Sequence, residues 1–214
     1  DSTGSRGAVG IAERSQETRL ARRTGPFAAR YLCARDREVG MNRNEMFEAL
    51  AARGPHPDIA QSANAIYAAF VGSWDVEVLD LEGDGARRVS RGEWHFAWIL
   101  EGRAMQDVLM VPPRGERRNG ALAKGNRCAT TLRVFDPASG MWRVHYFNPT
   151  TQIEETFTAK QEGRQIVQAA TDGNGATVRE TFSGIDAASF RWRREISDRF
   201  GSWKLKAEYI ATRR

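Results

Sequence analysis

The sequence predicts an all-β fold, an antiparallel up-and-down barrel of about ten strands preceded by two short helices. From Val71 to the C-terminus, apolar residues recur with a period of two, as in strands that bury one face. Turn-forming residues interrupt this pattern at nine places, namely 82–85, 101–102, 112–126, 136–140, 148–150, 161–163, 172–175, 183–186 and 198–201. The connections are too short for crossover helices, so neighbouring strands should pair antiparallel. Closing such a sheet into a barrel removes its exposed edges.

Residues 1–40 are predicted to be a disordered, basic N-terminal extension. They hold eight arginines and five acidic residues among scattered glycines, without a helical or strand period. Most of the net charge of +5 therefore belongs to this segment. The rest of the chain has no basic cluster interleaved with aromatic residues, so we expect no nucleic-acid partner.

The location predicted from the sequence is cytoplasmic. The opening segment lacks the apolar core of a secretory signal peptide. No apolar run approaches the roughly 18–20 residues of a membrane helix, so we expect no membrane partner. Two cysteines, Cys33 and Cys128, are too few for a disulfide-stapled scaffold or a multi-cysteine zinc module.

Residues 41–70 are predicted to be a helical lead-in that covers the barrel as a lid or plug. Apolar residues at helical spacing predict a first helix over 44–52, and the Gly54–Pro57 stretch ends it. Asp58 is a candidate N-cap for a second helix over 59–70.

The barrel itself is predicted over residues 71–214, with an interior rich in tryptophan. The inward faces of three strands are expected to carry Trp74, Val76 and Val78; Trp94, Phe96, Trp98 and Leu100; and Trp203, Leu205, Ala207 and Tyr209. In the fourth strand the apolar residues Leu132 and Val134 are expected on the inner face, so the face on which Arg133 lies is ambiguous. The cluster of Trp94, Trp98, Trp142, Trp192 and Trp203 either fills the core or binds an aromatic ligand, and both roles can coexist.

Three charged residues fall on the apolar faces of their strands. Glu155 lies between Ile153 and Phe157, Glu180 between Val178 and Phe182, and Arg194 between Trp192 and Ile196. Burying an unpaired charge is costly, so these side chains should pair with one another or contact a ligand. A hairpin register that pairs Glu180 with Arg194 is available.

These charges have two interpretations. In the functional one, Arg194, with Tyr146 or Tyr209, anchors a polar head group, and Glu155 or Glu180 acts as an acid or base with a raised pKa. In the other, the charges form an internal salt bridge that fixes strand register, or they lie near an open, wet rim.

Histidine chemistry contributes little to the prediction. His56, His95 and His145 do not share metal-ligand spacing, so we predict no metal site and no cofactor. His145 is the one candidate for a haem ligand inside a barrel.

Several motifs resemble those of lipocalin-like (calycin) barrels. They are Phe70-Val71-Gly72-Ser73-Trp74-Asp75-Val76, Gly92-Glu93-Trp94 through Ile99-Leu100-Glu101-Gly102-Arg103, Arg133-Val134-Phe135-Asp136 with Met141-Trp142, and Phe190-Arg191-Trp192 with Ser202-Trp203. Over residues 60–214 the chain resembles a family of uncharacterised bacterial lipocalin-like domains, with a strand number closer to that of fatty-acid-binding proteins. The resemblance implies a barrel with a cavity but no particular reaction.

The leading functional hypothesis is an intracellular protein that binds a small apolar or aromatic ligand, with or without a carboxylate, in a Trp-lined cavity. The expected ligand-binding residues are Trp94, Trp98, Trp142, Tyr146, Glu155, Glu180, Trp192, Arg194 and Tyr209. The alternative is an isomerase, cyclase or lyase that uses Glu155 or Glu180 as general acid or base. A third hypothesis is a filled barrel that acts through its surface, as a homodimer.

Overall fold

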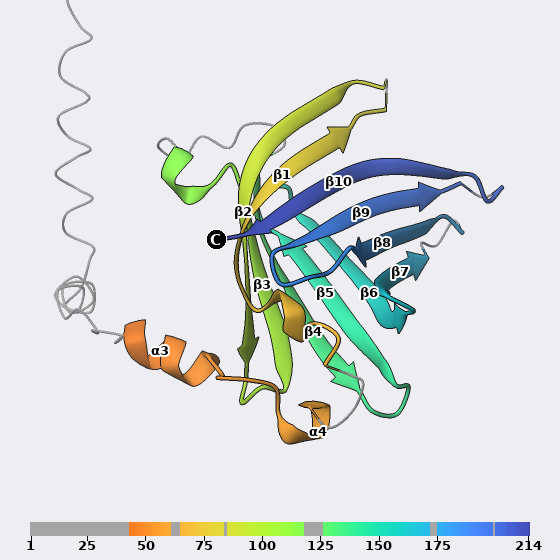
Figure 1. The fold of residues 1–214 in the computed structure, drawn as a ribbon. Coiled ribbons are helices and arrows are strands. Elements are labelled where there is room, and N and C mark those ends of the chain that lie inside the picture. The colour runs from red at the N-terminus through yellow and green to blue at the C-terminus, as the bar shows by residue number, and fades with distance from the viewer. Residues whose placement is uncertain (1–42, 61–64, 84, 118–125, 172–174, 199) are drawn as a thin grey trace, which may run out of the picture. The chain divides into compact units, whose positions relative to one another are not determined.

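The structure is a computed structural model that describes residues 43–60, 65–83, 85–117, 126–171, 175–198 and 200–214 (Figure 1). The chain divides into two compact units, residues 1–46 and 47–214. The predicted extension over residues 1–40 lies outside the described residues.

Short helices precede and interrupt a long series of strands. The helical elements are α3 (Arg43–Leu50), α4 (Pro57–Ala60), and the 3-10 turns η2 (Ala68–Phe70) and η3 (Arg114–Glu116). The strands are β1 (Gly72–Leu81), β2 (Arg87–Ile99), β3 (Ala104–Val111), β4 (Arg127–Asp136), β5 (Met141–Asn148), β6 (Ile153–Glu162), β7 (Gln165–Thr171), β8 (Thr177–Ser183), β9 (Ser189–Ser197) and β10 (Trp203–Arg213).

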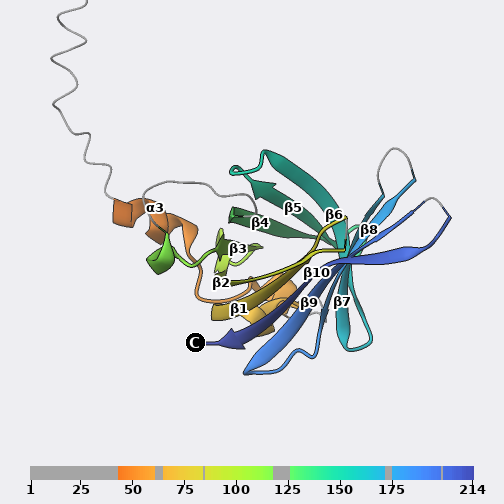
Figure 2. The same cartoon turned by 90° about the horizontal axis from the view of Figure 1, so that it is seen from above.

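The strands form one closed antiparallel barrel in the order β1-β10-β9-β8-β7-β6-β5-β4-β3-β2 (Figures 1 and 2). Each strand pairs with its sequence neighbours, and β1 closes the ring against β10, where Val78 faces Tyr209. The up-and-down topology and all nine predicted breaks between strands are confirmed. Alternation fixes which side chains point inward, because a slip of one residue would turn every buried residue to the outside.

The alternation fails at three predicted positions. Leu100 is half exposed because it sits in the β2–β3 turn with φ of 52°, after the strand has ended. Trp203 is 40% exposed, and a register shift between Leu205 and Ala207 separates it from the buried part of β10. In β4 the inner face belongs to Ala129, Thr131 and Arg133, so Arg133 is buried and the expectation for Leu132 and Val134 was wrong.

The two short helices predicted before the barrel are confirmed as α3 and α4, but the second is not helical over its whole predicted range. Of residues 59–70, Ile59 and Ala60 lie in α4, Ala65–Tyr67 are not helical, and residues 61–64 lie outside the described part of the chain. The apolar spacing over 59–70 reflects anchoring instead, because Ile59, Tyr67 and Phe70 are all buried. The segment crosses the β2–β3 turn, where the His56 amide donates to the Gly102 carbonyl at 2.9 Å. Gly102 has φ of +80°, and a side chain there would collide with the Gly54 carbonyl.

Aromatic rings fill one half of the barrel interior, which we call the filled half. Its rings are Tyr67, Phe70, Trp74, Phe96, Trp98, Trp142, Phe182 and Phe190. Phe190 packs edge to face against Phe70 and against Trp74, with ring centroids 4.8 Å apart in both pairs. The Trp74 indole donates to the Phe70 carbonyl at 2.7 Å, which fastens the lead-in to β1. In the described part of the chain, no helix is long and apolar enough to span a membrane.

Candidate binding cavity

The other half of the interior, the open half, contains a cavity of about 230 Å³. Its lining comes from the inward faces of β2, β3, β4, β5, β6, β8, β9 and β10. The lining residues are Trp94, Asp107, Leu109, Asn126, Arg127, Thr131, Arg133, Tyr146, Asn148, Thr151, Ile153, Glu155, Glu180, Trp192, Arg194, Ala207 and Tyr209. A volume of this size holds a small molecule but no long chain.

One wall of the cavity is aromatic. The Trp192 and Tyr209 rings lie 4.3 Å apart on the paired strands β9 and β10. Trp94 on β2 approaches both rings, with centroid distances of 6.3 Å to Trp192 and 6.0 Å to Tyr209. Trp94 also contacts Phe96 and Phe190, so it lies at the boundary between the two halves.

The wall beside it carries the three charges predicted from alternation, because Arg194 follows Trp192 by two residues on β9. Glu180 and Arg194 are direct partners in the β8–β9 register, and the Arg194 Nη1 donates to Glu180 Oε1 at 2.7 Å. Arg194 also forms a two-point ion pair with Glu155, one contact being Nη1 to Oε2 at 2.9 Å. Because β6 and β9 are not neighbours, this pair spans the interior. The sequence therefore placed all three charges correctly on the inner face.

A second buried network joins the cavity to the lead-in. Gln168 donates to Glu180 Oε2 at 2.7 Å and accepts from the Tyr67 hydroxyl at 2.9 Å. Arg133, which is 1% exposed, pairs with the equally enclosed Asp107 and also donates its Nε to Gln168 at 3.3 Å. Its guanidinium lies 4.9 Å from the centre of the Tyr67 ring. Arg133 thus connects the filled half to the cavity.

A third ion-pair group lies toward the end of the barrel away from the lead-in. Asp80, near the end of β1, accepts from Arg127 at 2.6 Å and from Arg88 at 2.7 Å. Burial opposes ionisation of Asp80, but these arginines lower its pKa below the ordinary value. The Arg127 guanidinium also lies 5.7 Å from the centre of the Tyr209 ring.

Burial shifts several pKa values at the cavity. It raises the pKa of the Glu180 carboxyl, against the opposing effect of Arg194. It raises the pKa of Tyr146 to about 12 and that of Tyr209 further, so both phenols stay protonated at neutral pH. Burial disfavours the charge on Arg194, but Glu180 and Glu155 overcome this and raise its pKa.

The structure brings together seven of the nine expected binding residues. Those lining the cavity are Trp94, Tyr146, Glu155, Glu180, Trp192, Arg194 and Tyr209. Trp98 and Trp142 do not line it, because both are buried in the filled half with their rings 6.2 Å apart. His145 is not among the lining residues either. No group of three or more metal-ligating side chains occurs among the described residues.

Sequence reasoning missed Arg133, Asp107, Gln168 and the Asp80–Arg127 pair. Alternation alone contained the signal for Asp107 and Gln168, which lie between Met105 and Leu109 and between Ile166 and Ala170. Arg133 was hidden by the apolar residues on either side of it, which are only half-buried. Its burial depends on Asp107 from the neighbouring strand, and no local pattern shows that contact.

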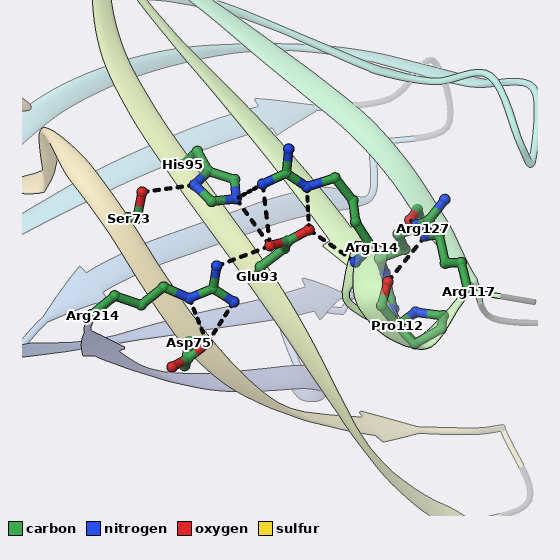
Figure 3. Close-up of polar contacts among 9 residues, drawn as sticks. All are labelled: Ser73, Asp75, Glu93, His95, Pro112, Arg114, Arg117, Arg127 and Arg214. Atoms are coloured by element: carbon green, nitrogen blue, oxygen red, sulfur yellow. Dashed lines mark hydrogen bonds and ion pairs between the residues drawn. The ribbon is translucent and has the colours of Figure 1, made fainter.

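A separate polar cluster lies on the outer face of β1 and β2 (Figure 3). Glu93 accepts from Arg114 at 2.6 Å and from Arg214 at 3.0 Å, and His95 lies 3.3 Å away. Arg214 also contacts Asp75, which ties the chain end to β1. Burial opposes ionisation, but the hydrogen bonds from both arginines prevail and lower the pKa of Glu93 to about 2. The cluster satisfies its own charges and braces the closing strands.

Comparison with known proteins gives only remote likenesses. No protein-family model matches the chain, and no curated protein matches it. Among solved structures, the S-type phycobiliprotein lyase CPES from Guillardia theta is similar with a TM-score of 0.48 and 10% identity, covering 72% of this chain and 93% of that one. The protein EF1p2_mFAP2b bound to DFHBI is similar with a TM-score of 0.31 and 14% identity, covering 68% and 94%.

Both TM-scores lie below 0.5, so neither likeness bears on what this chain binds. The barrel seen in the structure itself agrees with the lipocalin-like architecture expected from the sequence.

Proposed function

We propose that this chain is a lipocalin-like protein that binds a small aromatic molecule in the open half of its barrel. The observation that carries the proposal is the cavity of about 230 Å³, which is lined by aromatic rings and, next to them, by paired charges. The filled half shows that these strands can close-pack an interior with rings, so the open half is not a consequence of barrel size. Membership of the bacterial lipocalin-like family and a cytoplasmic location stay predictions.

The aromatic wall supports a flat ligand. Trp94, Trp192 and Tyr209 present ring surfaces that a planar molecule can contact by stacking or edge to face. The charged side chains beside the rings are already paired with one another, so they can orient a ligand but do not neutralise a charge on it.

Filling the cavity tests the proposal. Leu109, buried on β3, lines the cavity, whereas its neighbour Val108 points outward. Leu109→Trp should abolish binding of naphthalene and coumarin, followed by the fluorescence of the wall tryptophans and by calorimetry. Val108→Trp is the matched control and should bind as the unaltered chain does. Thermal melts would confirm that both variants fold.

Absence of binding would overturn the proposal. If the unaltered full chain binds neither probe, and native mass spectrometry of protein from its source shows no small-molecule adduct, the cavity is not a ligand site. Equal binding by Leu109→Trp and the unaltered chain would contradict it as well, because the probes would then sit elsewhere.

A second candidate, an acid–base enzyme, is favoured by one observation. Glu180 is 8% exposed on the cavity wall, and burial raises its pKa toward the range useful for proton transfer. Proton–deuterium exchange of 2-indanone next to its carbonyl, followed by NMR in D₂O, would report such activity. Exchange that the chain accelerates and Glu180→Gln loses, with coumarin binding retained, would favour the enzyme over the binding protein.

A further inference from the structure

We propose that the ligand is an uncharged aromatic molecule with a hydrogen-bond-accepting oxygen of the ring-carbonyl type, received by donors on Trp94 and Tyr209. This inference rests on the proposed binding function and names the class of ligand. It follows from the hydrogen-bonding groups that the cavity wall leaves unused.

The unused groups are donors. The Trp94 Nε1–H is buried and has no hydrogen-bond partner among the described residues. A buried donor without a partner is unfavourable, and Trp94 lines the cavity, so an acceptor on a bound ligand would satisfy this donor. The Tyr209 hydroxyl likewise has no hydrogen-bond partner among the described residues, although Tyr209 is only 3% exposed and lines the cavity.

Arg133 is not among the unused donors. Its Nη1 donates to Asp107 and its Nε to Gln168, and its guanidinium is also hydrogen-bonded to the Tyr67 side chain. Arg133 and Trp94 both line the cavity and both contact the Phe96 ring, at 5.7 Å and 4.9 Å from its centre. Trp94, which holds an unused donor, thus lies where the cavity meets the filled half.

The acceptors of the wall, in contrast, are occupied. Glu180 accepts from Arg194 through one oxygen and from Gln168 through the other. Both oxygens of Glu155 accept from Arg194. Asp107 accepts from Arg133. A ligand that offered a donor would have to displace an arginine or Gln168 from one of these carboxylates.

The charges also balance without a ligand. The cavity lining holds three arginines and three carboxylates, with Arg133 paired to Asp107 and Arg194 to Glu155 and Glu180. The third arginine, Arg127, pairs with Asp80 outside the lining. A carboxylate ligand would therefore be buried without a counter-ion, and an ammonium ligand likewise, which costs more than the binding of a neutral ring returns.

Three probes of similar shape test the inference by calorimetry at neutral pH. They are coumarin, which is neutral and carries a ring carbonyl, naphthalene, which has no acceptor, and coumarin-3-carboxylate, which is anionic. Coumarin should bind about tenfold more tightly than either of the others, because it alone satisfies the donors without adding a charge.

Variants locate the effect. Tyr209→Phe and Trp94→Phe should each weaken coumarin binding by about five- to tenfold and leave naphthalene binding within about twofold. Tyr146→Phe is the matched control, because the Tyr146 hydroxyl lines the same cavity but is already hydrogen-bonded to Asn148. It should change coumarin binding by less than about twofold.

The outcomes separate the ligand class from the binding function. Naphthalene binding as tightly as coumarin would overturn the ligand class and leave the binding function standing. Tighter binding of coumarin-3-carboxylate would show that the ligand is an anion and overturn the inferred neutrality. Equal losses in Tyr146→Phe and Tyr209→Phe would overturn the role of unused donors. Binding of none of the three probes would count against the proposed function itself.

Discussion

The filled and open halves of this barrel are built from the same strands, yet one excludes a ligand and the other has room for one. In the filled half, inward positions carry rings that meet at centroid distances of about 5 Å, such as Phe70 with Phe182. In the open half, the same strands carry Arg133, Glu180 and Arg194 at inward positions. Paired charges hold fixed hydrogen-bond geometries and cannot interdigitate as rings do. The difference teaches that inward charge, more than aromatic content, marks the site.

The largest effect on the free energy of unfolding is expected where the filled half meets the open half. Arg133→Met should lower the free energy of unfolding by about 3–5 kcal/mol, because it leaves Asp107 buried without its partner. Urea denaturation measures the change. Removing both charges in Arg133→Met/Asp107→Leu should recover most of the lost stability. A double variant no more stable than Arg133→Met would show that the ion pair does not account for the stability of this region.

The next effect compares a ring from each half. Phe190→Ala should cost about 3–4 kcal/mol, because Phe190 is enclosed by Phe70, Trp74 and Phe182 and its removal opens a new cavity. Trp192→Ala should cost only about 2 kcal/mol despite the larger ring, because one side of Trp192 already faces open space.

The same urea titrations compare these two variants with the unaltered chain. Trp203→Ala, which changes an exposed ring outside both halves, serves as the control and should shift stability by less than about 1 kcal/mol. Equal costs for Phe190→Ala and Trp192→Ala would mean that the open half is packed as tightly as the filled one.

The fold was predictable from the sequence because its signals are local. Period-two alternation and turn chemistry repeat at every strand and connection. Two errors fell where a strand had ended or shifted, at Leu100 and Trp203, and the third fell within β4, at Arg133. The two short helices before the barrel were predicted, but the second was expected to continue through residues 65–67, because burial of Tyr67 and Phe70 against the barrel mimics helical spacing.

The site was only half predictable. Glu155, Glu180 and Arg194 interrupt apolar runs, so the sequence of each strand is enough to show that its charge faces inward. Arg133 depends on Asp107 and Gln168 from other strands, and the enclosure of Trp142 in the filled half involves the ring of Tyr67 from the lead-in. Such contacts are set by closure of the barrel and leave no pattern along the chain.

The smallest effect is a pH dependence that distinguishes a cavity carboxylate from an outer one. Because burial raises the pKa of Glu180 above 4.5, the folded protein holds this proton to a higher pH than the unfolded chain does. The contribution of Glu180 to the free energy of unfolding therefore falls as the pH rises from 4.5 to the pKa that Glu180 has in the folded protein. The slope is at most about 1.4 kcal/mol per pH unit. Glu180→Gln should remove that decline in urea titrations run over a pH series.

Glu93 provides the opposite sign as a control. Its pKa is lowered from 4.5 to about 2, so its contribution is complete above 4.5 and disappears as pH falls toward about 2. Glu93→Gln should thus lose stability at neutral pH and converge with the unaltered chain in acid, whereas Glu180→Gln should converge with it in acid and gain on it as pH rises. Parallel curves for the two variants would show that burial in the open half does not control the Glu180 proton.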